Sequence, residues 1–510
     1  MSKEDIRRMS RKEFLKVAGA GALLPLVGCA TAPVEGERTA SADEIPNVIL
    51  IISDDHNPYE LGVINPELST PNLDRLARTG VRFPNAFVNV SLCGPSRAAI
   101  HTGLYNRENG VMDNMDYMRP EDALVPRIRE GGYVTGFVGK WHFDPFYLPD
   151  SHRKFGFDWE GSVLPAGGVA PAGELIYKPN GKDREPIAVG RAEVEGVFTD
   201  GALSFISSHR DKRFFLWLAY FVPHEPCLMP EKFARMYDPS DVSLPPNYLD
   251  KHPYFVEPRY GTMEDKQERK NAFKKGIAGH RGLVSWLDAE VGRILALLDE
   301  LGLSEKTMII FIGDNGYMLG SHGLNSKSYV YEESIRVPLI ISLPSRFKPR
   351  VCEELVYNLD LLPTVLDIAK IPIPESVSGR SLLPLLEGRR VEWRKEVFCE
   401  CRPQYGCLAQ DPLRHPRKDR TVRTKEWKYI YTVQGGDELY NIAEDPYEMK
   451  NLANERKYRD ILEELKRKWN EWEKKVGEPR FITQEEINRC AEALKEADYS
   501  PSAFESAGYH

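Results

Sequence analysis

Long hydrophobic runs are scarce in this chain of 510 residues. The one near the N-terminus covers residues 17–27, far fewer than the roughly 20 residues that a membrane-spanning helix needs. No later apolar run is long enough to span a bilayer. No internal repeat stands out either. The sequence therefore predicts no transmembrane segment.

An excess of positive charge is also lacking. The chain carries 68 Lys and Arg against 76 Asp and Glu, for a net charge of −8. This balance argues against a nucleic-acid surface, which is usually strongly basic. An acidic protein that handles an anion must concentrate positive charge locally, so Lys and Arg that follow short apolar runs are candidates for anion binding.

Cysteine is present at only 8 positions, Cys29, Cys93, Cys227, Cys352, Cys399, Cys401, Cys407 and Cys490. Cys399, Cys401 and Cys407 have no partner His or Cys at a zinc-like spacing, so we interpret them as structural. If Cys29 and Cys93 are modified, six remain that could form disulfides in an oxidising compartment. Their connectivity does not follow from the sequence.

The first 28 residues predict an export signal, because basic residues precede an apolar run that ends at Gly28-Cys29. Residues 10–16 resemble a twin-arginine motif with Lys in place of the second Arg, and residues 26–29 resemble a lipobox. In a lipobox Cys29 becomes the lipidated N-terminus; the alternative is a plain signal peptide. Residues 29–43 then form a tether. We expect export to the periplasm or cell surface, with membrane contact only through this anchor.

Two buried strands are predicted to end in acidic turns. Residues 47–53 are β-branched and apolar and precede Asp54 and Asp55, and residues 307–312 precede Asp314 and Asn315. Adjacent carboxylates repel each other and need a cation. Three carboxylates and an amide oxygen form an oxygen donor set that suits Ca²⁺ or Mg²⁺.

Two further runs repeat this arrangement with basic side chains. Residues 133–138 precede Lys140 and His142, and residues 214–221 precede His224. Ligands of open α/β sheets bind at the carboxyl ends of the strands, so we expect these side chains and the acidic turns at one edge. Any single Lys or His in such a place is more often a capping or surface residue. Because all four strand ends carry such residues, we favour a shared functional site at this edge of the sheet.

Helical patterns lie between these runs. Thr70, as N-cap, and Pro71 open one that Gly80 closes, and residues 265–302 form a long amphipathic one. The alternation predicts an α/β domain with a large, mostly parallel sheet flanked by helices. A smaller α+β subdomain follows, with short strands over residues 397–401, 421–424 and 427–432 and an amphipathic helix over residues 458–475. We expect a catalytic domain over 44–370, a connecting segment over 371–395, the subdomain over 396–476 and a tail over 477–510.

The stretch from Cys93 to Gly103 is the most distinctive motif. Pro95 suits the first turn of a helix, which places Cys93 just ahead of its N-terminus, where free amides favour an anion. Arg97 could bind the same anion through its guanidinium. The alternative is a buried Cys beside an ordinary helix start.

This motif resembles the maturation signature of the type I sulfatases, Cys/Ser-x-Pro-x-Arg followed by Thr-Gly. Further stretches resemble blocks of that family and occur in family order: 70–77 with Gly80, 139–142, 223–226, 313–316, 319–327, 332–338, 438–441, 445–446 and 451–453. The resemblance covers most of the chain after the signal. It implies an alkaline phosphatase-like fold.

The resemblance also implies a role for each site residue. A formylglycine-generating maturation enzyme would oxidise Cys93 to formylglycine (3-oxoalanine), whose hydrate attacks sulfur. Asp54, Asp55, Asp314, Asn315 and the modified Cys93 would hold one divalent cation, usually Ca²⁺, with Mg²⁺ as an alternative. Arg97 would stabilise the hydrate, Lys140 and Lys327 would bind sulfate, His224 with Lys327 would protonate the leaving alcohol, and His142 would help release sulfate. His322 is either a substrate contact or a turn-stabilising residue.

These expectations lead to one main hypothesis and two alternatives. The main one is an exported enzyme that hydrolyses a sulfate monoester, with a sulfated carbohydrate as substrate. The first alternative is a phosphonate or phosphate ester hydrolase of the same superfamily. The second is a non-catalytic sulfoglycan-binding surface protein, which the filled set of polar positions disfavours.

Overall fold

The computed structural model describes residues 45–114, 116–143, 155–164, 174–176, 187–254, 263–401, 419–432 and 435–480. The predicted export signal and the tether with Cys29 lie outside these residues, as do Cys407, Cys490 and the chain from residue 481 on. All structural statements below concern the described residues.

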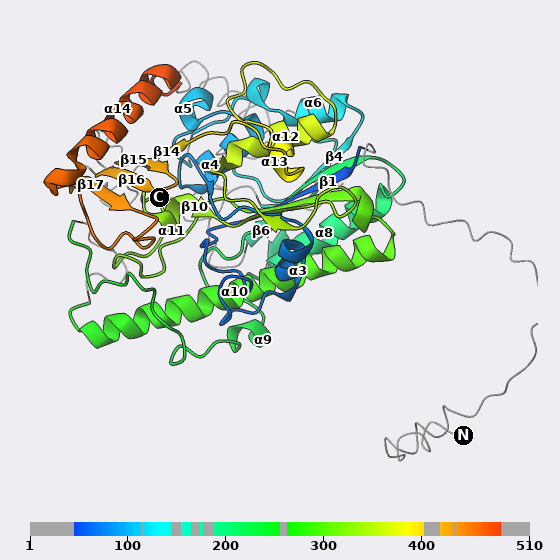
Figure 1. Ribbon diagram of the computed structural model, residues 1–510. Helices are drawn as coiled ribbons and strands as arrows, with labels where there is room; N and C mark the ends of the chain where they lie inside the picture. The colour runs from blue at the N-terminus through cyan, green and yellow to red at the C-terminus, as the bar shows by residue number, and fades with distance from the viewer. Residues whose placement is uncertain are drawn as a thin grey trace, which may run out of the picture. The chain divides into compact units, whose positions relative to one another are not determined.

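The largest sheet has eight strands in the order β12-β2-β11-β9-β1-β8-β4-β5 (Figure 1). The central strands β9, β1, β8 and β4 are parallel, whereas β11 runs antiparallel to both of its neighbours. The strands are β1 (Asn47–Ser53), β2 (Val81–Arg82), β4 (Val134–Lys140), β5 (Trp159–Leu164), β8 (Phe214–Ala219), β9 (Thr307–Gly313), β11 (Leu339–Ser342) and β12 (Arg350–Val351). The predicted mostly parallel sheet is therefore confirmed, and the four predicted runs are neighbouring strands.

Strand β1 shows why these runs are apolar throughout. Val48, Leu50 and Ile52 pack into the core on one side of the sheet, and Ile49 and Ile51 pack into the core on the other. Successive side chains of a strand point to opposite faces, so a strand covered on both faces has no polar positions.

Helices cover both faces of the sheet (Figure 1). One face is covered by α3 (Pro71–Thr79), α8 (Val194–Ser208) and α10 (Lys266–Glu300), with α9 (Glu231–Ala234) beside α10. The other is covered by α4 (Cys93–Thr102), α6 (Val125–Glu130), α12 (Leu361–Ile368) and α13 (Leu383–Leu386). Smaller elements are α5 (Asn106–Asn109), α11 (Glu332–Ile335), a sheet of β3 (Ala86–Phe87), β10 (Arg336–Val337) and β13 (Val356–Tyr357), and the pair β6 (Glu174–Ile176) and β7 (Ile187–Val189).

The start of α3 corrects one prediction. Thr70 precedes the helix, but its side chain makes no capping hydrogen bond. The amides of Asn72 and Leu73 instead donate to Asp288 Oδ1 of α10, at 3.0 and 2.7 Å. The cap thus comes from a carboxylate more than 200 residues away, which local sequence rules cannot anticipate. The predicted long helix itself is confirmed as α10, with Asp265 as its N-cap.

A second sheet, fully antiparallel, forms the predicted C-terminal subdomain. Its strands are β14 (Glu396–Cys401), β15 (Asp419–Thr424), β16 (Trp427–Thr432) and β17 (Gly436–Asn441), of which β17 was not predicted as a strand. Helix α14 (Arg459–Val476) packs across them (Figure 1), with Leu465, Trp469 and Trp472 in a core shared with the sheet. The smaller α+β subdomain is therefore confirmed.

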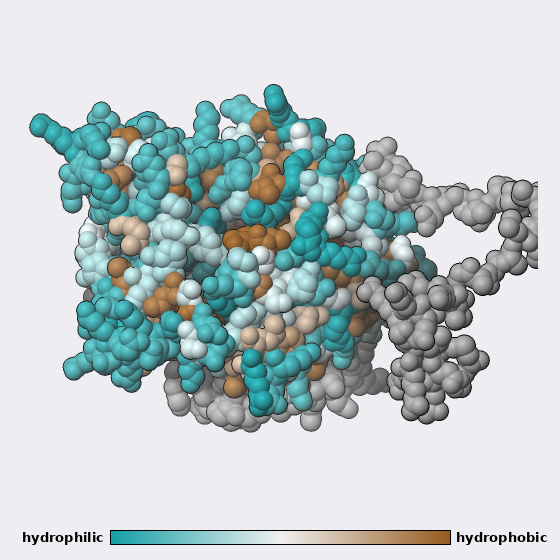
Figure 2. All heavy atoms as spheres, turned by 60° about the horizontal axis from the view of Figure 1, so that its bottom comes forward, coloured by the Kyte–Doolittle hydropathy of each residue, from teal (hydrophilic) through white to brown (hydrophobic). Residues whose placement is uncertain are grey.

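Among the described residues, few large hydrophobic side chains are exposed. No described helix has the combination of length and apolar character that crossing a bilayer requires. On the face drawn in Figure 2, hydrophilic side chains dominate and hydrophobic ones form small separate groups.

Arg107 links the α/β domain to the C-terminal subdomain. Its guanidinium, on α5, donates to both carboxylate oxygens of Glu400 on β14, at 2.8 and 3.1 Å. It also donates to Glu473 of α14 at 2.7 Å. The side chains of Arg107 and Glu400 are fully buried. Removal of one member of such a pair leaves the other charge buried and unpaired.

We predict that Arg107→Met lowers the free energy of unfolding by about 3–5 kcal/mol, because Glu400 would lose its buried partner. Urea unfolding followed by intrinsic tryptophan fluorescence measures the change. The matched control is Arg75→Met, which removes an exposed pair with Asp299 and should cost at most about 1 kcal/mol. Equal midpoint shifts in the two variants would contradict this role of Arg107.

Candidate active site

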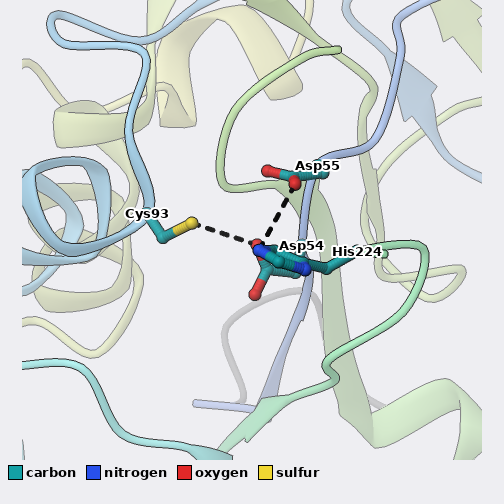
Figure 3. A group of neighbouring side chains, drawn as sticks. All are labelled: Asp54, Asp55, Cys93 and His224. Carbon is teal, nitrogen blue, oxygen red and sulfur yellow. Dashed lines mark hydrogen bonds and ion pairs between the residues drawn. The ribbon is translucent and has the colours of Figure 1, made fainter. Parts of the chain in front are cut away.

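The candidate site lies where the four central strands end. In the sheet register Ser53 of β1 pairs with Gly313 of β9, so Asp54 and Asp314 leave the sheet side by side. Strands β8 and β4 follow next in the sheet and lead to His224 and Lys140. Figure 3 shows Asp54 and Asp55 at the end of β1, with Cys93 and His224 reaching them from other segments.

The acidic residues form one buried cluster. The amide of Asp55 donates to Asp314 Oδ1 at 3.1 Å, and Asn315 Nδ2 donates to Asp55 Oδ1 at 2.7 Å. Burial, and then the charge of Asp54, raise the pKa of Asp314 to about 6. The carbonyl oxygen Asn315 Oδ1 is buried without a hydrogen-bond partner. Three carboxylates and this unpaired amide oxygen fit a hard divalent cation.

Three cationic side chains surround the cluster. Arg97 binds Asp314 Oδ2 through Nε and Nη2, both at 2.9 Å. Lys140 pairs with Asp54, and Lys327 Nζ lies 2.6 Å from Asp55 Oδ1. Burial alone would raise the pKa of Asp54, but Lys140, followed by His224, Lys327 and Arg97, holds this pKa well below its ordinary value.

Cys93 points into this charged group. Its Sγ lies 3.2 Å from Asp54 Oδ1 and 2.8 Å from Lys327 Nζ. Burial, and then the charge of Asp54, raise the pKa of the Cys93 thiol. An unmodified thiol here therefore stays protonated at neutral pH and is a weak nucleophile.

The helix start at Cys93 differs slightly from the prediction. Helix α4 begins at Cys93 itself, so Pro95 is its third residue. Arg97 then lies one turn further on, where its guanidinium reaches Asp314 and the carbonyl of Lys140. Its described contacts are thus with the carboxylates of Asp314 and Asp54 and with a backbone carbonyl. Gly103 ends the helix with a φ of 67°, a left-handed conformation that glycine adopts at low cost.

Two histidines flank the cluster. His224 Nε2 lies 3.6 Å from Asp55 Oδ2, Nδ1 lies 2.5 Å from the carbonyl of Glu225, and the side chain is 23% exposed. Burial, and then the charge of Lys327, lower the pKa of His224 to about 4. His142 is buried directly after β4, and burial and then Lys140 lower its pKa well below the ordinary value. Both imidazoles are therefore neutral at neutral pH.

The backbone at the site is strained. Asp55, His142, Ser326 and Ser328 have φ values of 64°, 58°, 74° and 69°. A non-glycine residue in this region costs about 1–2 kcal/mol, and such residues cluster at functional sites. Ser326 and Ser328 lie on either side of Lys327, so the strain falls on the segment that presents this ammonium group.

Gly139, just before Lys140, allows β4 to pack closely against β8. Its φ is 104°, and a Cβ at this position would lie 1.9 Å from the carbonyl oxygen of Ala219 on β8. The pairing of β4 with β5 is irregular between Phe137 and Gly139. A side chain at residue 139 would push apart the two strands that lead to Lys140 and His224.

His322 lies apart from Cys93 and the acidic cluster. Its ring stacks on Tyr331 at a centroid distance of 4.2 Å, and its Nε2 lies 3.1 Å from Asn247 Nδ2. It belongs to a separate buried cluster with Glu333 and Glu448. Within the described residues, none of its contacts reaches Cys93 or the acidic cluster, which favours the turn-stabilising alternative.

Sequence reasoning missed the support beneath Asp55. His280 of α10 contacts the carbonyl of Asp55 through Nε2 at 3.1 Å and Glu60 through Nδ1 at 2.7 Å. The only sequence signal is a polar residue inside the pattern that predicts α10. The missed contact lies between residues 225 positions apart.

Comparison with known families gives a consistent result. The family model "Sulfatase" matches residues 46–371, and the model "N-sulphoglucosamine sulphohydrolase, C-terminal" matches residues 320–475. The first of these ranges contains the four strands and every member of the buried charged cluster.

Two named relatives are similar over most of their length. An N-acetylglucosamine-6-O-sulfatase of Bacteroides thetaiotaomicron is 26% identical over 87% of this chain and 88% of its own. A multifunctional alkaline phosphatase superfamily protein of Trinickia caryophylli, PehA, is 28% identical over 84% of this chain and 95% of its own.

Solved structures share the fold. A protein solved with its substrate D-glucosamine-2-N,6-O-disulfate superimposes with a TM-score of 0.72 at 24% identity, over 85% of this chain and 98% of its own. A phosphonate monoester hydrolase from Silicibacter pomeroyi has a TM-score of 0.69 at 25% identity, over 86% and 98%. With a family model over well more than half of its residues, this chain belongs to the type I sulfatases of the alkaline phosphatase superfamily.

Proposed function

We propose that this sulfatase releases inorganic sulfate from a sulfated carbohydrate, using formylglycine made from Cys93 and one divalent cation. The observation that carries the proposal is the position of Cys93 Sγ, which contacts both Lys327 and Asp54 and belongs to one group of possible metal ligands with Asp54 and Asp55. A nucleophile made from Cys93 would lie between a cationic group and an oxygen donor set.

Asp54, Asp55, Asp314 and Asn315 would hold the cation, and their all-oxygen chemistry favours Ca²⁺, with Mg²⁺ as the alternative. When bound, the cation supplies charge that stabilises developing oxygen charge during sulfate transfer. It would also offset the carboxylates that Lys140 and Lys327 now contact. Both ammonium groups would then be available for the sulfate oxygens.

The remaining residues have separate roles. Arg97 holds Asp314 and stabilises the hydrated nucleophile from within α4. His224 is the most exposed of the polar groups around Asp55, so it is suited to deliver a proton to the leaving alcohol, together with Lys327. Burial, and then the charge of Lys327, lower the pKa of His224, and a bound anionic sulfate would offset the lysine charge. His142 assists sulfate release.

The carbohydrate part of the proposal is supported by the named relatives. One is an N-acetylglucosamine-6-O-sulfatase, and another, from Formosa agariphila, is an ulvan-active sulfatase that is 27% identical over 85% of this chain. The export pattern of residues 1–28 fits an enzyme that meets its polysaccharide outside the cytoplasm. A formylglycine-generating enzyme would be a required partner during maturation.

We predict that protein co-expressed with a formylglycine-generating enzyme yields a Cys93 peptide in which the CH2SH side chain has become an aldehyde. Mass spectrometry of that peptide is the measurement. Cys93→Ala should abolish sulfate release, because it removes the nucleophile. An unmodified thiol in cells that convert a control sulfatase would contradict the proposed nucleophile.

We predict that Asp54→Asn lowers the affinity for Ca²⁺ by at least about 10-fold, because it removes a charged ligand. Calorimetric titration and metal analysis of the purified protein measure the loss. The control is Asp288→Asn, which makes the same chemical change at a buried residue that caps α3. If both variants bind Ca²⁺ with equal affinity, Asp54 is not a ligand of the cation.

We predict faster release of sulfate than of phosphate or phosphonate from esters with the same aryl leaving group. The comparison of kcat/KM values for matched 4-nitrophenyl esters is the measurement. Preference for the phosphonate or phosphate ester would overturn the sulfatase proposal and support the alternative that the shared fold with phosphonate monoester hydrolases leaves open.

A further inference from the structure

One buried aromatic ring contacts several groups at the site. Phe221 follows β8, is fully buried and lies three residues before His224. The imidazole of His224 stacks on its ring at a centroid distance of 4.8 Å and an angle of 23°. The Lys140 ammonium lies 5.1 Å from the ring centroid, and the guanidinium of Arg191 lies 4.0 Å from it. The negative face of a phenyl ring attracts cations and supports stacking.

Arg191 links this ring to the backbone of the histidine loop. Its Nη2 donates to the carbonyl of His224 at 3.3 Å, and its Nη1 donates to Glu195 Oε1 at 3.1 Å. The second oxygen of Glu195 accepts the backbone N–H of Phe221 at 3.2 Å. Arg191 and Glu195 are 6% and 0% exposed. The three residues therefore form a closed, buried set of contacts behind His224.

We infer that Phe221 and Arg191 are positioning residues that hold the His224 imidazole and the Lys140 ammonium for sulfate transfer. The inference rests on the proposed function, which assigns the proton to His224 and a sulfate contact to Lys140. Neither Phe221 nor Arg191 touches the acidic cluster through any contact described, so their effect on the reaction passes through these two groups.

Loss of the Phe221 ring should affect substrates differently, according to how much their leaving group needs a proton. A hydroxyl of the hydrated formylglycine would form a bond to sulfur as the bond between sulfur and the ester oxygen breaks, and the leaving oxygen would take a proton from Nε2 of His224, which is protonated while the anionic ester is bound. An alkyl alcohol is a poor leaving group and needs this proton, whereas 4-nitrophenolate leaves readily without it. A positioned general acid contributes about 10²–10⁴-fold when the leaving group needs a proton. A displaced imidazole therefore slows alkyl sulfates far more than aryl sulfates.

The test compares kcat/KM for an alkyl or sugar sulfate with that for 4-nitrophenyl sulfate in the holoenzyme with bound cation. Each value is divided by the fraction of Cys93 converted to formylglycine, so that a maturation defect does not count. We expect Phe221→Leu to reduce the alkyl value at least about 10-fold more than the aryl value. Arg191→Lys keeps a cation but cannot contact both Glu195 and the carbonyl of His224 through two nitrogens. It should also reduce the alkyl value more than the aryl value, but by a smaller factor.

The matched control is Phe205→Leu, a substitution in α8. Phe205 is a fully buried phenyl of the same core that packs on Trp159 and Phe214, away from His224. Equal reduction of both substrates in Phe221→Leu, or a bias no larger than in Phe205→Leu, would overturn the inference. If the wild type prefers phosphate or phosphonate esters, the proposed function fails, and the same comparison with those esters still decides the role of Phe221.

Discussion

Repulsion among three buried carboxylates is the constraint on which the rest of the site depends. Asp54, Asp55 and Asp314 lie where neighbouring strands end, and the fold gives them almost no contact with water. Such a group is stable only when positive charge offsets it. Arg97, Lys140 and Lys327 supply that charge from three different segments, and a divalent cation on the same oxygens would add to it.

The large sheet brings these charged residues together and stabilises the fold around them. Strands β9, β1, β8 and β4 are parallel and adjacent, so their carboxyl ends present polar turns along one edge while helices cover both faces. The apolar strands bury their side chains in a large core, and this burial stabilises the fold that carries the charged edge. Helix α4 then places Cys93 against the carboxylates, and α10 supports Asp55 from below through His280.

The fold alone does not select the ester. Structures of this architecture include a protein solved with a sulfated glucosamine and a phosphonate monoester hydrolase. Selection must therefore come from the groups that meet the ester and its leaving group. Phe221 contacts both His224 and Lys140, so in the proposed mechanism this buried ring would link the group that delivers the proton to a group that binds the anion.

The sequence by itself determined the four central strands, the long helix and the residues that end each central strand, because these features depend on neighbours along the chain. Apolar runs followed by Asp54, Lys140, His224 and Asp314 were enough to predict one polar sheet edge. Only the tertiary structure decided which distant groups meet. Asp288 caps α3, Arg97 binds Asp314, and His322 lies with Tyr331. Such pairs are set by packing of segments far apart in sequence, and no local pattern records that packing.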